Sequence, residues 1–302
     1  MPFFSIVIPV YNREDLLTET LQSIKNQSFT DWECIVVDDG STDGTVNLMK
    51  QESLLDNRFK YIYQDNAERS AARNNGSENA QGEYICFLDS DDKYVESYLQ
   101  ILHDKIKATN YLEALFISDF CIWDGMKVEV VDVPLIQKPI ADWLFHFPVS
   151  PSRACVHKNI LCKYKFREDI VIVEDTVLWV SIANEYQVIQ VKHPLVWYRV
   201  HEGNSVHEGT KSAFDRYKGM KKFFLEPESE QVSKQVKKEM LSDVKFRMAE
   251  YYRSTNNNFQ ALKECFHSII IQPRNYHTKL KLFFIITYFP GFNFVWRKIK
   301  KQ

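Results

Sequence analysis

The chain has 302 residues, of which 45% are hydrophobic and 26% are charged, and its formal net charge is −2. This length suits one large domain, or one large domain with a smaller one, built around a substantial core. The near balance of charges gives no indication of a nucleic-acid partner. The six cysteines include no C-x-x-C pair, which is typical of reduced thiols in a cytosolic protein. No apolar run reaches the roughly 18 residues that a membrane-spanning helix needs.

The first ninety residues alternate apolar segments with amphipathic segments. The opening run, MPFFSIVIPVYN, has no basic leader, so we interpret it as a strand rather than a signal peptide. Strands are expected at 4–10, 32–37, 59–63 and 84–88, and helices at 14–26, at 69–79 and in a short segment ending near 52. This alternation predicts an α/β fold whose mostly parallel sheet is flanked by helices on both faces.

The pattern is less regular after residue 92. A helix is expected at 95–109, strands at 115–120, 127–133 and 188–191, and a further helix beginning at Glu174. Residues 134–172 combine prolines with aromatic residues, and we assign them no regular element. From about Phe214 the chain is expected to be helical, and residues 248–271 faintly resemble one tetratricopeptide pair. The alternative, a plain helical extension, needs no neighbouring repeats.

An acidic cluster, FLDSDD, follows the fourth expected strand. Asp89, Asp91 and Asp92 lie within four positions, and such carboxylates can bind Mg²⁺ or Mn²⁺, which then bridges to phosphate oxygens. A solvated acidic turn is the alternative. The carboxyl end of a buried strand is where open α/β sheets bind ligands, which favours a metal-nucleotide site. The chain contains neither the G-x-G-x-x-G nor the G-x-x-x-x-G-K-[ST] loop of other nucleotide sites.

Four motifs occur in a fixed order, each at an expected strand end or on the helix before the last strand: PVYNRE (9–14), VVDDGSTDGT (36–45), RSAARNNG (69–76) and FLDSDD (87–92). Together they resemble family 2 glycosyltransferases, an inverting group with the GT-A fold. The resemblance covers roughly residues 4–120 and continues more weakly through VEDTVLW (173–179) and YRVHEGNS (198–205). It implies a GT-A domain over 1–213, with a donor half to about 120 and an acceptor half from 121, followed by a helical C-terminal extension over 214–302.

The resemblance implies a site for a nucleotide-diphospho-sugar, most simply a UDP-sugar, bound with Mn²⁺ or Mg²⁺. Tyr11 could stack on the uracil ring and Asp39 could accept its N3–H, while Asp38 supports the turn. Arg73, which shares a helix face with Arg69, could contact phosphate or base oxygens. The implied donor-binding set is Pro9, Tyr11, Asn12, Glu14, Asp39, Arg73, Asp89, Ser90, Asp91, Arg199 and His201.

Three residues of that set are the implied metal ligands. Asp91 resembles the direct ligand, Asp89 the residue that faces ribose and metal, and His201 a further ligand or a phosphate donor. Arg199 resembles a residue of a loop that closes over the diphosphate. Asp175, the second residue of the Glu174-Asp175 pair, resembles the general base, which an acceptor hydroxyl needs in order to attack. A helix N-terminal acid without catalytic function is the alternative for Asp175.

The resulting hypothesis is a metal-dependent, inverting glycosyltransferase that uses a glycan or lipid-linked acceptor in cell-surface polysaccharide or glycan assembly. A sugar-nucleotide pyrophosphorylase would carry a glycine-rich loop where this chain has Val10-Tyr11-Asn12-Arg13. A non-catalytic nucleotide-sugar binder would not need Asp175. The aromatic and basic tail, 280–302, suits peripheral contact with the inner face of the plasma membrane, or a helix packed on the domain.

Overall fold

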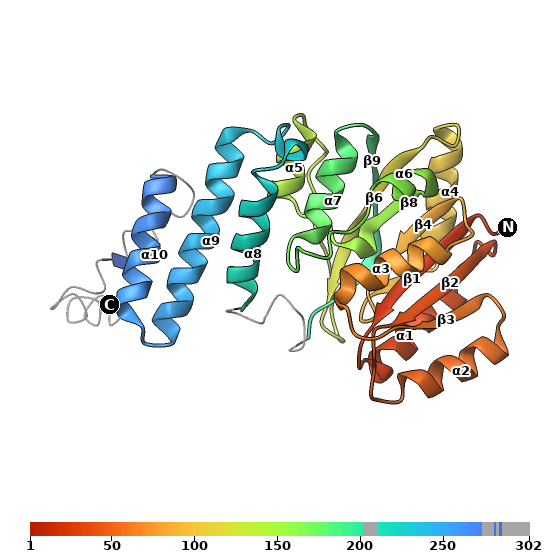
Figure 1. Cartoon of the computed structure of the whole chain (residues 1–302). Coiled ribbons are helices and arrows are strands. Elements are labelled where there is room, and N and C mark those ends of the chain that lie inside the picture. The colour runs from red at the N-terminus through yellow and green to blue at the C-terminus, as the bar shows by residue number, and fades with distance from the viewer. Residues whose placement is uncertain (202–210, 274–280, 282–283, 286–302) are drawn as a thin grey trace. The chain divides into compact units, whose positions relative to one another are not determined.

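The structure is a computed structural model of the chain, and it describes residues 1–201, 211–273, 281 and 284–285 (Figure 1). The chain divides into two compact units, Met1–Gly203 and Asn204–Gln302. The sequence predicts a boundary at 213, whereas this division falls at 203. Each unit is described by itself below.

The strands of the first unit form one nine-stranded sheet with the order β3-β2-β1-β4-β8-β6-β9-β5, and β7 pairs with β6. The strands are β1 (Phe4–Val10), β2 (Trp32–Asp38), β3 (Phe59–Tyr63), β4 (Tyr84–Phe87), β5 (Lys93–Tyr94), β6 (Ala114–Trp123), β7 (Val128–Val130), β8 (Ala154–His157) and β9 (Gln187–Arg199). Strands β3, β2, β1 and β4 are parallel, as are β6 and β9. The pairs made by β5, β7 and β8 are antiparallel, so the sheet, predicted as mostly parallel, is mixed.

Helices flank this sheet (Figure 1). They are α1 (Glu14–Lys25), α2 (Thr45–Leu55), α3 (Glu68–Asn79), α4 (Tyr98–Ala108), α5 (Ile140–His146), α6 (Lys158–Lys163) and α7 (Glu174–Ala183). Strand β1 is buried on both faces. On one face Ile6 and Ile8 join the core cluster that includes Leu21 and Leu102. The opposite face packs on α3, which explains why the strand is a continuous apolar run rather than an alternating one.

The segment 134–172 contains regular structure that the sequence analysis did not predict. It contains α5, the central antiparallel strand β8 and α6. Strand β8 has only four residues, ACVH, all of them buried. A run this short carries too little periodicity to distinguish a buried strand from a buried loop.

The described helices of the second unit are α8 (Lys211–Phe223), α9 (Lys234–Ser254) and α10 (Asn258–Ile271), so the expected helical C-terminal extension is confirmed. Helices α9 and α10 pack around Phe246, Ala249, Ala261 and Cys265. The side chains of Ser233 and Asn257 cap the two helices. No described helix is both long and apolar enough to cross a bilayer. Most of the tail that the sequence analysis assigns to membrane contact lies outside the described residues.

Gly76 permits the close packing of α3 on β1, and its replacement gives a test of the fold. A methyl group added at Gly76 would lie 2.4 Å from Val7 Cγ1. We therefore expect Gly76→Ala to lower the free energy of unfolding by roughly 1–3 kcal/mol through overpacking, although alanine favours a helix. Urea unfolding measures this change. Asn79→Ala, at the exposed end of the same helix, is the control, and equal stability of both variants would contradict the packing argument.

Candidate functional site

The carboxyl ends of β1, β2 and β4 meet at one edge of the sheet. Val10 pairs with Asp38 and Val7 pairs with Phe87, so Tyr11, Asp39 and the acidic loop after β4 all follow that edge. The chain adds β2 and β3 on one side of β1 and then returns to add β4 on the other. This reversal makes the ends of β1 and its neighbours a topological switch point, the place where open α/β sheets bind ligands.

Asp38 and Asp39 have different surroundings. The Asp38 carboxylate is fully buried and accepts hydrogen bonds from Ser41 N and from the Tyr61 hydroxyl, both at 2.8 Å, so its predicted supporting role is confirmed. Asp39 Oδ1 accepts from Gln64 Nε2 at 2.7 Å and from the main-chain N of Ala67 at 2.9 Å. These two donors orient the Asp39 carboxylate. No group in the described part of the chain donates to its second oxygen, Oδ2.

Tyr11 directly follows β1, the strand that pairs with β2, and Asp39 directly follows β2. The Tyr11 side chain is half exposed, at 50%. An aromatic face and one carboxylate oxygen are therefore presented at the same sheet edge. These are the groups that stacking on a pyrimidine and accepting a ring N–H require.

Asn12 and Glu14 connect the turn after β1 to the loop after β2. Asn12 Oδ1 accepts from Thr42 N at 2.7 Å, and Glu14 Oε2 accepts from Gly44 N at 3.1 Å. A Cβ at Gly44 would lie 2.2 Å from the Glu14 carboxylate, so a larger residue there would displace the Glu14 side chain. The two side chains of Asn12 and Glu14 thus shape the loops at this edge of the sheet. Pro9 lies inside β1, opposite Val37 in the sheet.

Asp92, the last carboxylate of the acidic loop, holds this loop in place. Asp92 is buried, and it accepts from the Ser152 hydroxyl at 2.7 Å and from Arg199 N at 3.0 Å. Burial, and then the charges of Asp89 and Asp91, raise the pKa of Asp92 well above its ordinary range. Ser152 Oγ also accepts from Asp89 N at 3.0 Å. Asp92 therefore anchors the loop, while Asp89 and Asp91 are bonded to other parts of the site.

Asp91 lies next to His201. Its Oδ2 is 3.0 Å from His201 Nε2, and the two side chains are 18% and 21% exposed. Within the described residues, no group of three or more His, Cys, Asp or Glu side chains is arranged to hold a metal ion. A Mn²⁺ or Mg²⁺ that binds a nucleotide needs only one or two protein ligands, because phosphate oxygens and waters complete its shell. Asp91 and His201 are two residues of this loop region that could serve as such ligands.

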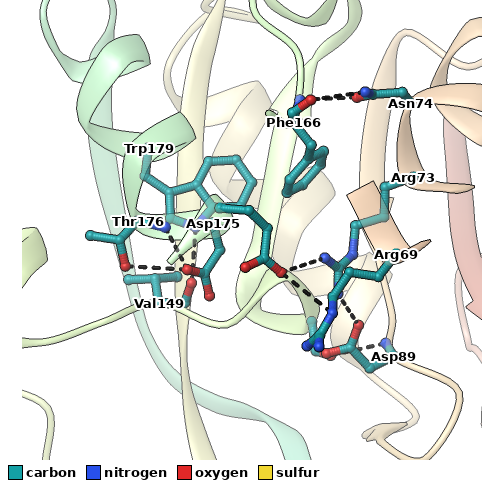
Figure 2. Close-up of polar contacts among 11 residues, drawn as sticks. Arg69, Arg73, Asn74, Asp89, Val149, Phe166, Asp175, Thr176 and Trp179 are labelled. Carbon is teal, nitrogen blue, oxygen red and sulfur yellow. Dashed lines mark hydrogen bonds and ion pairs between the residues drawn. The ribbon is translucent and has the colours of Figure 1, made fainter. Parts of the chain in front are cut away.

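Arg73 connects the acidic loop to the start of α7 (Figure 2). Its Nη2 donates to Asp89 Oδ1 at 2.7 Å and its Nη1 donates to Glu174 Oε1 at 3.2 Å, with only 3% of the side chain exposed. Burial would lower the pKa of Arg73, but the two carboxylates raise it above its ordinary value. Arg69 Nε lies 3.9 Å from the same Glu174 oxygen. The arginine predicted to contact the donor lies between two carboxylates, one of them in the predicted metal-binding loop.

Glu174 and Asp175 begin α7 with different exposure. Burial, and then the charge of Asp175, raise the pKa of Glu174 to about 7, while Arg73 opposes the shift. Asp175 is partly exposed, and its Oδ1 accepts from Thr176 N at 2.5 Å and from the Thr176 hydroxyl at 3.2 Å (Figure 2). Of the two carboxylates, Asp175 is the more exposed.

The resemblance implies that Arg199 lies in a loop that closes over the diphosphate, but in the structure Arg199 has other partners. Its Nε donates to the Asp91 carbonyl at 3.0 Å, its Nη2 lies 3.0 Å from Glu19 Oε2, and the residue is 9% exposed. Sequence reasoning missed Glu19 and Ser152, because neither belongs to a motif and both act through partners far away in the chain. The rest of the YRVHEGNS motif, from residue 202, lies outside the described residues.

The raised pKa of Glu174 predicts a pH dependence of stability. A carboxyl whose pKa rises on folding stabilises the folded state at pH values below 4.5, and this contribution is lost as the pH rises through about 7. We expect Glu174→Gln to remove a fall in unfolding free energy, on the order of 3 kcal/mol, across that window. Urea unfolding at a series of pH values measures it. Glu78→Gln, an exposed glutamate on α3, should keep the parent slope, and the same slope in Glu174→Gln would refute the assignment.

Residues 5–131 match the family model for Glycosyl transferase family 2. A Campylobacter jejuni protein, GalNAc(5)-diNAcBac-PP-undecaprenol beta-1,3-glucosyltransferase, is 29% identical over 281 residues, which cover 90% of each chain. The Bacillus subtilis glycosyltransferase EpsH is 40% identical over 230 residues, or 71% of this chain. Among solved structures, S. aureus TarS 1–349 in complex with UDP-GlcNAc matches with a TM-score of 0.65 and 22% identity, covering 89% of this chain and 81% of that one.

The likeness to TarS shows a common fold, and it confirms the predicted GT-A type. The chain spans 65% of the length of EpsH and as little as 15% of another curated relative. The substrates of those longer proteins therefore describe them and not this chain.

Proposed function

The chain belongs to glycosyltransferase family 2, and on that premise we propose that it transfers a sugar from a UDP-sugar to an acceptor hydroxyl with inversion of the anomeric carbon. One observation carries the proposal: Tyr11, Asp39 and the acidic loop that contains Asp91 all follow the carboxyl ends of β1, β2 and β4, at one edge of the sheet. In this proposal Tyr11 and Asp39 bind the nucleobase, Asp91 and His201 hold the cation, and Asp175 is the general base. The Arg73 contacts connect the acidic loop to the helix that begins beside Asp175.

The donor is bound through its nucleotide. Tyr11 stacks on the base, and the Asp39 carboxylate, oriented by Gln64 and Ala67, accepts the ring N–H of uracil. TarS, whose fold this chain shares, binds UDP-GlcNAc and UDP, which supports a nucleotide-sugar donor. Asp91 and His201 would hold Mn²⁺ or Mg²⁺, with Asp89 as a further ligand when Arg73 releases it. When bound, such a cation neutralises charge on the leaving diphosphate.

Asp175 performs the step that binding alone cannot supply. Its carboxylate takes the proton of the acceptor hydroxyl while the hydroxyl oxygen forms a bond to the anomeric carbon of the donor. The bond from that carbon to the diphosphate breaks in the same displacement, and its electron pair leaves with the nucleoside diphosphate. Attack from the face opposite the leaving group inverts the anomeric centre. Glu174, buried behind Arg73, holds the network rather than the acceptor.

The setting that we propose is the assembly of a cell-surface polysaccharide or glycan at the cytoplasmic face of the plasma membrane. The name of the C. jejuni relative includes an undecaprenol-linked glycan, which supports a lipid-linked acceptor for this chain. The aromatic and basic composition of 280–302 supports peripheral contact with an anionic membrane. Of that tail, only residues 281 and 284–285 are described.

Replacing the base distinguishes a transferase from a binder. We expect Asp175→Asn, which keeps the shape and removes the basicity, to lower the transfer rate by about 10²–10⁴-fold and to leave UDP affinity nearly unchanged. Transfer assays and calorimetry measure the two quantities. Glu174→Gln is the matched control and should cost less. If Asp175→Asn transferred sugar at the parent rate, or if Glu174→Gln had no transferase activity, the general base would lie elsewhere.

The cation proposal has its own test. We expect EDTA to suppress release of nucleoside diphosphate from a panel of sugar nucleotides, and added Mn²⁺ or Mg²⁺ to restore it. Asp91→Ala should fold but should lose the gain in UDP affinity that the cation gives, roughly tenfold or more for a lost charge-assisted contact. Asp124→Ala, on an exposed turn, should keep that gain. Full turnover in EDTA would reject the metal assignment.

A further inference from the structure

A cluster of four side chains from four elements lies behind the acidic loop. We call Glu19 of α1, Lys93 of β5, Trp123 of β6 and Arg199 of β9 the buttress cluster. Arg199 meets the Glu19 carboxylate through both terminal nitrogens, at 3.0 and 3.3 Å, and Lys93 pairs with the same carboxylate. The Trp123 ring lies 4.2 Å from Arg199 Cζ and 3.9 Å from Lys93 Nζ. Two cations thus share one aromatic ring and one carboxylate.

The buttress cluster fixes the chain next to Asp91 on both sides. With its terminal nitrogens held by Glu19, Arg199 uses Nε to bind the Asp91 carbonyl at 3.0 Å. Its main-chain N binds the Asp92 carboxylate at 3.0 Å. The next residue, Val200, donates its N–H to the Trp123 carbonyl at 2.8 Å, which directs the strand toward His201. Both members of the Asp91–His201 pair are therefore placed by one arginine and its support.

We propose that Glu19 is a positioning residue for the cation site: by holding Arg199, it sets the separation of Asp91 and His201. The inference rests on the proposed function of that pair. It also assigns Arg199 to support of the acidic loop, in place of direct contact with the diphosphate. Glu19 also pairs with Lys93, but its route to the Asp91–His201 pair in this proposal is through Arg199.

The physical basis is that Glu19, Asp91 and a bound diphosphate can each pair with the buried guanidinium of Arg199. Arg199 is 9% exposed, and its charge needs compensating partners. Arg199, and then Lys93, lower the pKa of Glu19, so this carboxylate stays ionised at neutral pH. Glutamine at this position would offer one neutral acceptor instead of a bidentate carboxylate. The guanidinium would then turn toward Asp91 or the diphosphate, and the spacing of the cation ligands would no longer be set.

The test measures how much Mn²⁺ strengthens UDP binding. Calorimetry of UDP with and without Mn²⁺ gives this gain, and electron paramagnetic resonance of Mn²⁺ gives metal binding without any turnover. We expect Glu19→Gln to reduce the Mn²⁺-dependent gain about tenfold, a loss of one charge-assisted contact, and to leave metal-free UDP affinity unchanged. Gln22→Ala, one turn along α1, is the matched control and should keep the parent gain, since the Gln22 amide is bonded to Asn26 and to no other side chain in the described part of the chain.

A double-mutant cycle tests the route of the effect. If Glu19 acts through Arg199, Glu19→Gln should cost almost nothing further in an Arg199→Gln background. Additive losses would overturn the inference, as would an unchanged Mn²⁺ gain in Glu19→Gln or an equal loss of UDP affinity with and without Mn²⁺. Glu19→Asp, which keeps the charge but shortens the reach, replaces Glu19→Gln if the latter does not fold. A parent protein without any Mn²⁺ gain would instead reject the proposed cation site itself.

Discussion

One buried guanidinium, that of Arg73, joins a carboxylate of the acidic loop to a carboxylate at the start of α7. Asp89, Asp91 and Asp92 lie within four residues at the end of one strand, and Glu174 is brought to the same edge from the acceptor half. Arg73 binds the carboxylates of Asp89 and Glu174, while Arg199 binds the Asp91 carbonyl through its guanidinium and the Asp92 carboxylate through its main-chain N, and both arginines are less than a tenth exposed. Without them, mutual repulsion in a poorly solvated space would favour protonation of several carboxylates or separation of the loops. The donor and acceptor parts of the site depend on this compensation.

The compensation also separates residues that ligands contact from residues that hold the site. Asp92 and Glu174 are buried and bonded, and the pKa of each is raised. Asp91 and Asp175 are partly exposed. A carboxylate that must bind a cation or take a proton needs access, whereas one that fixes a loop needs partners. Each of the adjacent pairs Asp91-Asp92 and Glu174-Asp175 therefore contains one accessible carboxylate and one buried carboxylate that fixes the structure.

The sequence predicts the donor half well because its strands are buried on both faces and each ends in a motif. Strands β1, β2 and β4 and the residues that follow them lie where the patterns indicate. In the acceptor half the helix at Glu174 and the strands at 127–133 and 188–191 are predicted, whereas the elements within 134–172 are not, because β8 is too short to show a period. Ser152 and Glu19 could not be predicted, since their importance comes from partners sixty or more residues away, Asp92 and Arg199. Arg199 belongs to a motif, but a motif gives no direction for a side chain.

The Ser152 hydroxyl has a consequence for how such enzymes can diversify. It donates to Asp92 and accepts from Asp89 N, so a residue of the acceptor half shapes the loop that would grip the donor. The two halves therefore do not evolve as freely exchangeable parts. An acceptor half acquired by recombination brings its own version of this contact, and a new acceptor specificity must preserve a hydroxyl at that point or rebuild the acidic loop around its loss. A single hydroxyl oxygen, that of Ser152, thus links the acceptor half of this protein to the loop that would bind the donor.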